Sequence, residues 1–403
     1  MSSTNSFKLG FWALCLFSFL FSVYNEEWDL IGAKRKALYA ILACLFLVSL
    51  ALLMFEKMQQ IAITFLLLMG LNTPLALFMK VDYITLPPNL DTKIQIVGDV
   101  LPGFSGVESI TTDSKGFRTT KKIDYSDKEP FRVFAIGGST TEQLALDDHE
   151  TWTSVLQELL EQKTGRDVEV INTGVSGLTS RQHYATLEEI KNYQPDMVLF
   201  MMGINDWNKD IKALQSAIPF PELGFRNTPL RYGLENAFNI ANSFRPKAPD
   251  NLTIERGDYY SKQNDSLNRP EKVDVTFKTV SERYKNWVQK ISDGCKEWGL
   301  NCIFIDQPVA YQAEIEQGLR ERLWMTPPNE AYTLSLNNLT DISNTYNSWL
   351  ISFARNSEHL KACPISQNVP ASIKYLTDDC HFNEAGAKLV GTLISDCLVS
   401  TIH

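Results

Sequence analysis

Long apolar runs without charge occupy the first 80 residues of this 403-residue chain. They lie at residues 9–25, 37–55 and 58–79. A helix needs about 20 apolar residues to cross the hydrocarbon core of a bilayer, and the second and third runs have that length. The first run is marginal and also fits a signal peptide, but no small-residue cleavage site follows it. We therefore predict a membrane anchor of about three transmembrane helices at residues 1–80.

A different pattern begins at residue 131, where short apolar runs alternate with segments of helical periodicity. The short runs predict strands at residues 132–138, 168–174, 197–203 and 301–308. The periodic segments predict helices at residues 151–165, 180–193, 275–299 and 384–399. Strands that alternate with helices indicate a parallel sheet with right-handed crossovers. The pattern predicts an α/β domain over residues 131–403.

Three segments depart from this alternation. Residues 81–130 contain short β-like runs and several glycines, and we predict a small irregular β linker element there. Residues 207–274 and 309–358 are long and polar, and we interpret them as insertions. Because they follow the third and fourth predicted strands, they leave the sheet at its carboxyl edge, where ligands bind in open parallel sheets. We expect them to take part in substrate recognition; an addition without ligand contact is the alternative.

Charge divides the chain at the same boundary as hydrophobicity. Residues 1–80 carry a net charge of +2 and the remaining residues −11, which together give the −9 of the whole chain. An acidic domain is a poor partner for nucleic acid, and no basic stripe interleaved with aromatic residues is present in the sequence. The composition therefore predicts no nucleic-acid partner.

Two opposing patterns bear on which side of the membrane the domain lies. Residues 34–36 are basic and directly precede the second predicted span. By the positive-inside rule they lie in the cytoplasm, and with three spans the domain does too. The cysteines indicate the opposite. Cys295 with Cys302, and Cys363 with Cys380, are local pairs that can form disulfides in an oxidising compartment, although buried free thiols fit the same spacing.

Polar and glycine-rich clusters follow the predicted strands. They are Gly137–Thr140 after the first strand, Asn172–Thr179 after the second and Gly203–Asp206 after the third, and Asp378–Asn383 precedes the last helix. The carboxyl ends of parallel strands meet at one edge of a sheet, so we expect these clusters to converge.

Within these clusters the residue types fit acyl transfer through a serine nucleophile. Ser139 needs a base, and His381 is the only one of the five histidines with a carboxylate, Asp378, three residues earlier. That carboxylate can accept the second ring N–H and stabilise the imidazolium. The oxyanion of the tetrahedral intermediate needs donors, which the backbone N–H groups of Ser139 and Gly177 and the amide of Asn205 can supply. We predict a catalytic serine, histidine and aspartate with an oxyanion hole beside them.

The same residues, in this order, resemble those of SGNH hydrolases, also called GDSL esterases. The resemblance covers residues 132–210 and 373–399. It rests on four blocks, which here are Ser139, Gly177, Asn205, and Asp378 with His381. It implies a three-layer, flavodoxin-like sandwich with a parallel sheet and no metal or organic cofactor. One position departs from the family pattern, because Gly138 stands where the motif that names the family has aspartate.

A second similarity concerns the segment before the first predicted strand. The run Asp113–Arg118 is similar to the lead-in of bacterial SGNH proteins linked to surface polysaccharides. Together with the cysteine pairs, this similarity favours a domain outside the cytoplasm over the placement given by the positive-inside rule. We therefore predict an integral membrane protein whose domain lies on the periplasmic side of the inner membrane.

Two other kinds of site fit the sequence less well. A phosphate-binding loop requires Gly-x-x-x-x-Gly-Lys or Gly-x-Gly-x-x-Gly, and neither follows Gly137. Asp378, Cys380 and His381 are possible metal ligands, but no second Cys/His cluster has suitable spacing, and Cys380 has a candidate disulfide partner in Cys363. We therefore expect no metal.

These observations together predict a serine esterase that acts on an O-acyl ester of a glycan or lipid through an acyl-enzyme on Ser139. An O-acyltransferase that modifies a surface polysaccharide is an alternative, because a sugar hydroxyl can replace water as the acceptor. A non-catalytic binding or assembly protein on the same fold is a further alternative.

Overall fold

The computed structural model of the chain describes residues 83–96, 104, 106–215, 251–254, 271–272, 279–325 and 332–399. The predicted membrane anchor at residues 1–80 lies outside this part of the chain. None of the helices in the described part is long and apolar enough to cross a membrane.

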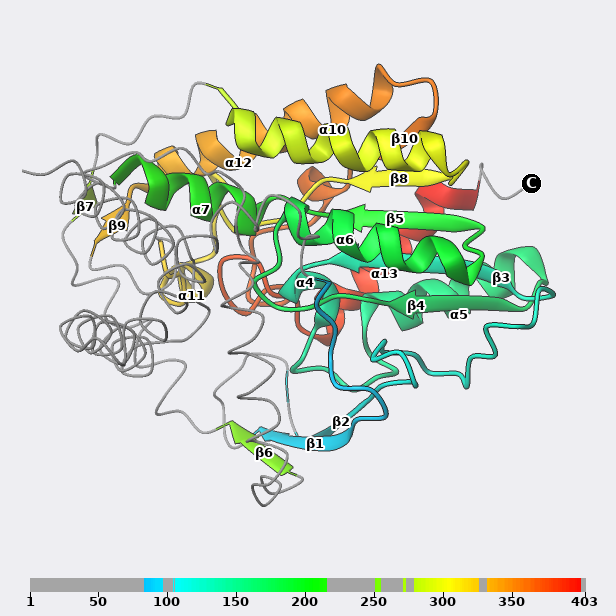
Figure 1. The fold of residues 1–403 in the computed structure, drawn as a ribbon. Coiled ribbons are helices and arrows are strands. Elements are labelled where there is room, and N and C mark those ends of the chain that lie inside the picture. The colour runs from blue at the N-terminus through cyan, green and yellow to red at the C-terminus, as the bar shows by residue number, and fades with distance from the viewer. Residues whose placement is uncertain are drawn as a thin grey trace, which may run out of the picture. The chain divides into compact units, whose positions relative to one another are not determined.

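Five parallel strands form the central sheet (Figure 1). Their bounds are β3 Phe131–Gly137, β4 Val168–Asn172, β5 Met197–Met201, β8 Cys302–Ile305 and β10 Leu360–Cys363. From one edge of the sheet to the other, they lie in the order β4-β3-β5-β8-β10. With the five strands numbered along the chain, this order is 2-1-3-4-5, the flavodoxin-like arrangement. Every residue of the first four is buried, as expected for strands covered on both faces. The predicted parallel α/β sheet is therefore confirmed.

Helices cover both faces of this sheet (Figure 1). The long ones are α5 Trp152–Thr164, α6 Ser180–Ile190, α7 Ile204–Gln215, α10 Glu282–Glu297, α12 Leu336–Arg355 and α13 Glu384–Val399. The short ones are α4 Ser139–Glu142, α11 Gln317–Arg320 and the 3₁₀ turns Lys191–Tyr193 and Ser366–Asn368. On one face α5 packs against α13; on the other α6 packs against α10, and α12 packs against β8 and β10. Thr151, Ser281 and Ser335 cap α5, α10 and α12 by accepting a hydrogen bond from a backbone N–H.

The helices α7 and α12 and the strand β10 were not predicted from the sequence. Most of α7 falls within residues 207–274, the first segment interpreted as an insertion. All of α12 falls within residues 309–358, which the polar composition marked as an insertion. Its core-facing side is apolar with helical spacing, as Leu339, Ile342, Tyr346 and Leu350 are all buried. Many Asn, Ser and Thr residues between them hide that period. The segment is thus part of one covering layer of the sheet.

Two smaller sheets join segments that are distant in sequence. β1 Asp91–Ile96 pairs antiparallel with β2 Gly106–Thr111 and parallel with β6 Asn251–Ile254. β7 Glu271–Lys272 pairs with β9 Thr333–Leu334. The segment predicted as a β linker therefore shares its sheet with part of the 207–274 segment.

The disulfide pattern corrects one of the two predicted cysteine pairs. Cys295 and Cys302 are bonded, as one pairing predicted. Cys363 is bonded to Cys397 rather than to Cys380, which is a buried free thiol. The predicted Cys363–Cys380 pair was wrong because β10 lies against α13, which carries Cys397, and this contact is invisible in the sequence.

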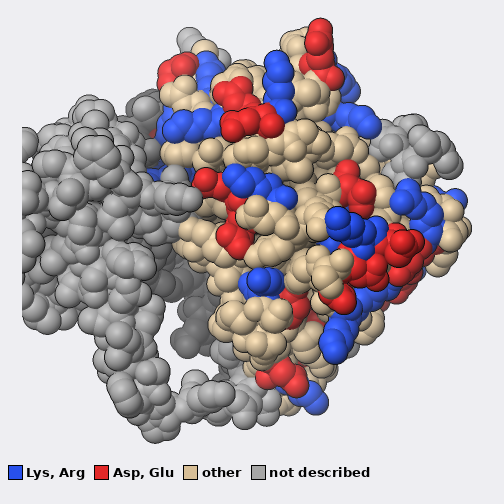
Figure 2. Space-filling view, turned by 45° about the vertical axis from the view of Figure 1, so that its right-hand side comes forward, with Lys and Arg blue, Asp and Glu red and all other residues tan. Residues whose placement is uncertain are grey.

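Acidic and basic side chains are intermixed on the face of the molecule shown in Figure 2. The described residues of this face form no continuous basic stripe.

Candidate active site

Ser139 begins α4 and is separated by one residue from the end of β3, at the carboxyl edge of the sheet. The turn that presents it needs glycine at two positions. A Cβ on Gly137 would lie 2.1 Å from Oγ1 of Thr141, and one on Gly138 would lie 2.6 Å from Nδ2 of Asn205. The close packing of this turn places the serine hydroxyl at the end of the strand with little freedom to move.

The structure brings together the serine, histidine and aspartate that the sequence singled out. Nε2 of His381 lies 2.7 Å from Oγ of Ser139, and its Nδ1 lies 2.8 Å from Oδ2 of Asp378. Oδ1 of Asp378 also accepts the backbone N–H groups of Cys380 and His381, both at 2.9 Å. The carboxylate is therefore fixed, and the imidazole can hold a proton on Nδ1 while Nε2 receives one from the serine.

The three predicted oxyanion donors also line the pocket at this serine. Gly177 has φ +79°, a conformation that favours glycine, and a Cβ there would meet nothing within 4 Å. Within the described residues, the backbone N–H groups of Ser139 and Gly177 donate to no protein atom. Nδ2 of Asn205 donates one hydrogen to the carbonyl of Leu178 at 2.9 Å, which leaves its second hydrogen available. These groups can stabilise an oxyanion formed at the serine.

Sequence comparison agrees with this arrangement. The model of the GDSL-like Lipase/Acylhydrolase family matches residues 135–389, more than half of the chain. The chain belongs to this family. No curated protein matches it.

Several solved structures are similar to part of this chain. A member of the lipolytic protein G-D-S-L family from Veillonella parvula is 11% identical, with a TM-score of 0.36 over 67% of this chain and 97% of that one. The lipase/acylhydrolase from Enterococcus faecalis is 15% identical, with a TM-score of 0.36 over 67% and 95% of the two chains. The psychrotrophic esterase EstA from Pseudoalteromonas sp. is 12% identical, with a TM-score of 0.37 over 66% and 96%.

The departure from the GDSL motif at Gly138 has a structural counterpart. Any side chain at this position would displace the amide of Asn205, the contact of 2.6 Å described above. In this member of the family, glycine therefore allows the amide to approach the nucleophile turn closely.

The pKa of His381 depends on two opposing influences. Burial alone would lower the pKa of the imidazole, but the charge and hydrogen bond of Asp378 outweigh it, with a further contribution from Cys380. The pKa is raised well above its ordinary value. The ring therefore takes up a proton readily, as a general base must.

Arg118 supports the nucleophile turn and was not recognised as a site residue in the sequence. Its buried guanidinium donates to the carbonyls of Glu142, Gln143 and Leu146 at 2.6–2.9 Å and pairs with the carboxylate of Asp148 at 2.7 Å. It thus satisfies carbonyl groups at and just beyond the end of α4. Arg118, the last residue of the run Asp113–Arg118, therefore helps to position Ser139.

A second support joins the two elements that carry Gly177 and Asn205. Asp206, at the start of α7, accepts the backbone N–H of Ser180 at 2.9 Å and its hydroxyl at 2.8 Å, at the start of α6. Arg283 pairs with the same carboxylate at 3.0 Å. Burial raises the pKa of Asp206, while Arg283 opposes that rise. This carboxylate ties together the starts of the two helices that adjoin the oxyanion donors.

A third network forms a wall beside His381. Oδ1 of the buried Asp379 accepts the hydroxyl of Tyr311 at 2.6 Å, and Oδ2 accepts the backbone N–H of Trp324 at 2.5 Å. The centroid of the Trp324 ring lies 5.6 Å from that of the imidazole. Burial and the neighbouring charge of Asp378 raise the pKa of Asp379 to about 7. This carboxyl group holds the tryptophan against the catalytic histidine.

We call the hollow at the nucleophile the serine pocket. Its volume is about 170 Å³, and its lining residues are Ser139, Ser176, Gly177, Ile204, Asn205, Asn208, Trp324, Cys380 and His381. Oδ1 of Asn208 is buried and has no hydrogen-bond partner in the described part of the chain. Asn208 was not predicted; its only sequence signal is its position one helical turn after Asn205 on α7.

The side chains of Asp378, Cys380 and His381 have ligand atoms within 4.8 Å of one another, a spacing that a metal ion could bridge. Cys380 is a free thiol, so no disulfide removes it as a possible ligand. However, both ring nitrogens of His381 already have protein partners, Ser139 and Asp378. Metal binding at this histidine would break one of those two contacts.

Proposed function

We propose that this chain is a serine esterase that hydrolyses a short O-acyl ester through an acyl-enzyme on Ser139. The observation that carries the proposal is the hydrogen-bonded series from Ser139 through His381 to Asp378. The family to which the chain belongs consists of lipases and acylhydrolases, which supports ester hydrolysis.

The reaction follows from the positions of these groups. Oγ of Ser139 attacks the ester carbonyl carbon while its proton passes to Nε2 of His381. The N–H groups of Ser139 and Gly177 and the amide of Asn205 stabilise the oxyanion that forms. His381 then gives its proton to the departing alkoxide, and the acyl group stays on the serine. Water, deprotonated by the same histidine, releases the acid and restores the serine hydroxyl.

The serine pocket supports a short acyl group on a polar carrier. Its volume of about 170 Å³ is below the range typical of pockets for drug-sized ligands. The carboxamide of Asn208 adds a polar group to the pocket wall. Trp324 offers an aromatic face beside the imidazole. A glycan that carries acetyl-sized esters fits these features better than a long-chain lipid does.

We also propose that the domain lies outside the cytoplasm and is attached through residues 1–80. Two disulfides within the described residues support this placement, because such bonds persist in oxidising compartments.

The test compares the full chain with its Ser139→Ala variant. A fluorophosphonate probe should label the wild type and not the variant, and hydrolysis of 4-nitrophenyl acetate should fall about 10⁴-fold or more. Ser126→Ala, which changes an exposed serine in a loop, is the matched control and should retain activity. Equal hydrolysis by wild type and Ser139→Ala would refute the proposal.

The same preparation separates hydrolysis from acyl transfer. We expect 4-nitrophenyl acetate to release free acetate at the same rate with and without an added oligosaccharide, and 4-nitrophenyl octanoate to react more slowly. Acetylated oligosaccharide formed at the expense of free acetate would instead identify a transferase with the same acyl-enzyme.

A further inference from the structure

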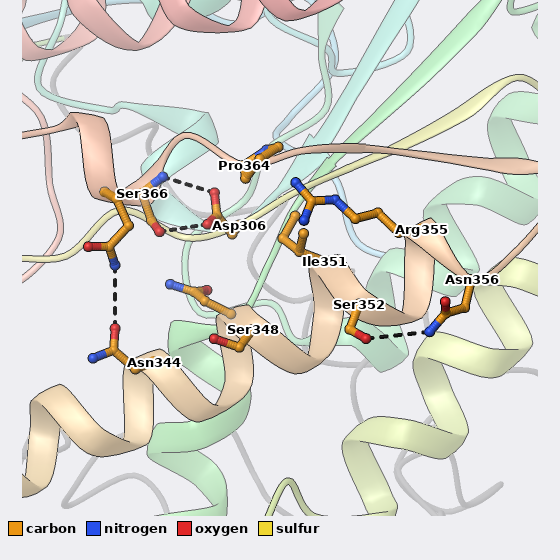
Figure 3. A pocket seen from close by; sticks show the side chains of 11 residues that line it. Asp306, Asn344, Ser348, Ile351, Ser352, Arg355, Asn356, Pro364 and Ser366 are labelled. Atoms are coloured by element: carbon orange, nitrogen blue, oxygen red, sulfur yellow. Dashed lines mark hydrogen bonds between the residues drawn. The ribbon is translucent and has the colours of Figure 1, made fainter.

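A second hollow lies at the same carboxyl edge, at the end of the sheet formed by β8 and β10 (Figure 3). We call it the α12 cavity. Its volume of about 390 Å³ falls within the range of ligand-binding pockets. Nine of its eleven lining residues have polar side chains, and only Ile351 and Pro364 are apolar. This composition suits a polar ligand.

The charges in the α12 cavity favour an anion. The buried carboxylate of Asp306 is already engaged, because it accepts the backbone N–H groups of Ile365 and Ser366 at 2.6 and 2.9 Å and the hydroxyl of Ser366 at 2.6 Å. Arg355 is exposed and is the only cationic residue in the lining. No ion pair joins it to another described residue, and its guanidinium turns back along α12 into the hollow (Figure 3). A ligand with a negative group would complete this arrangement.

The remaining polar groups match hydroxyls. Asn344 and Ser348 on α12 and Gln367 after β10 are exposed on the rim. Carboxamides and hydroxyls can both donate and accept hydrogen bonds, as sugar hydroxyls require. The amide of Gln367 donates to the side-chain oxygen of Asn344 at 3.4 Å.

A hydrogen-bonded connection links the α12 cavity to the nucleophile. Asn347, in its wall, accepts the backbone N–H of Gln307 at 3.0 Å and donates to its carbonyl at 2.9 Å. The side chain of Gln307 accepts the hydroxyl of Thr140 at 3.2 Å, and Thr140 follows Ser139. β8 lies two strands from β3, a separation of about 10 Å along the edge. The two hollows therefore adjoin neighbouring strand ends and are connected through buried side chains.

We propose that the α12 cavity binds a sugar unit that carries an anionic group, with Arg355 as the partner of that group. As a subsite for the glycan that is deacylated at Ser139, this assignment rests on the proposed esterase function. The proposal that the α12 cavity binds such a sugar depends only on the cavity and not on the esterase function. Binding and catalysis can thus be tested separately.

The experiment measures binding by calorimetry with full-length Ser139→Ala protein, in which the outcome does not depend on turnover. The probes are a trimer of galacturonic acid, the corresponding neutral trimer of galactose, and inorganic sulfate. We expect the acidic trimer to bind more tightly than the other two. Arg355→Gln should weaken binding of the acidic trimer about tenfold, because it removes one charged hydrogen-bonding group. Binding of the neutral trimer should not change.

Two further variants keep this test decisive. Arg355→Lys should retain part of the affinity, because it preserves the charge but not the forked geometry. Lys388→Gln removes one exposed charge from α13 on the opposite face and should leave binding unchanged. Equal binding of the acidic and neutral trimers, or no loss in Arg355→Gln, would overturn the assignment. Sulfate that binds as tightly as the acidic trimer would also overturn it, since a plain anion site needs no sugar. A chain that binds the acidic trimer but lacks esterase activity would contradict only the proposed function.

Discussion

The serine pocket and the α12 cavity lie on one edge of one sheet but hold their polar groups in different ways. In the serine pocket, His381 and Asp378 are fixed by several hydrogen bonds. In the α12 cavity, Asn344, Ser348 and Arg355 are exposed on a single helix. Groups that stabilise a transition state are most effective when they need no reorientation. Adaptable groups suit recognition of a ligand, whose hydroxyls can be matched in more than one way.

Disruption of the hydrogen-bonded series from Ser139 through His381 to Asp378 should reduce activity the most. We expect Asp378→Asn to lower kcat about 10⁴-fold, because the wrong tautomer and an unsupported imidazolium result. In the wild type, protonated His381 cannot accept the proton of Ser139, so activity should rise as pH increases through the raised pKa of this histidine. The acid limb of the pH profile of kcat/KM should therefore lie above the ordinary histidine value of about 6.5.

The pH profile of Asp378→Asn tests whether His381 controls the acid limb. Without the carboxylate, burial dominates and the pKa of His381 should fall, so the residual activity should persist to lower pH than in the wild type. An unchanged acid limb in Asp378→Asn would show that another group controls the profile.

Removal of one oxyanion donor should come next in size. Asn205→Ala should lower kcat about 10²- to 10³-fold with little change in KM, because the donor acts mainly on the transition state. Asn192→Ala, at an exposed asparagine in the 3₁₀ turn after α6, is the control and should behave as wild type. A higher KM with an unchanged kcat would indicate that Asn205 binds the substrate rather than the oxyanion.

The smallest loss of activity should follow substitution of Gly138, the glycine that replaces aspartate in the family motif. Gly138→Ala should reduce kcat about tenfold, because the added Cβ pushes the amide of Asn205 away without removing it. In the double variant with Asn205→Ala, the glycine substitution should cost little more. Full additivity of the two losses in a double-mutant cycle would argue against this coupling.

Much of the framework could be predicted because apolar periodicity reports local structure. The runs at 132–138 and 197–203 became β3 and β5, and the clusters after them meet at one edge. The predicted transmembrane helices lie outside the described residues and stay predictions. α12 was missed because polar residues interrupt its apolar face, and β10 because it is only four residues long and includes the exposed Lys361.

By itself, the sequence determined the positions of β3, β4, β5 and β8 and the residue types that follow β3, β4 and β5, because both are recorded locally in spacing and chemistry. Only the tertiary structure decided that Cys363 meets Cys397, that Arg118 supports the end of α4, and that a polar cavity opens beside Arg355. These features depend on contacts between segments far apart along the chain. Such contacts are set by how the layers pack, which no local period encodes.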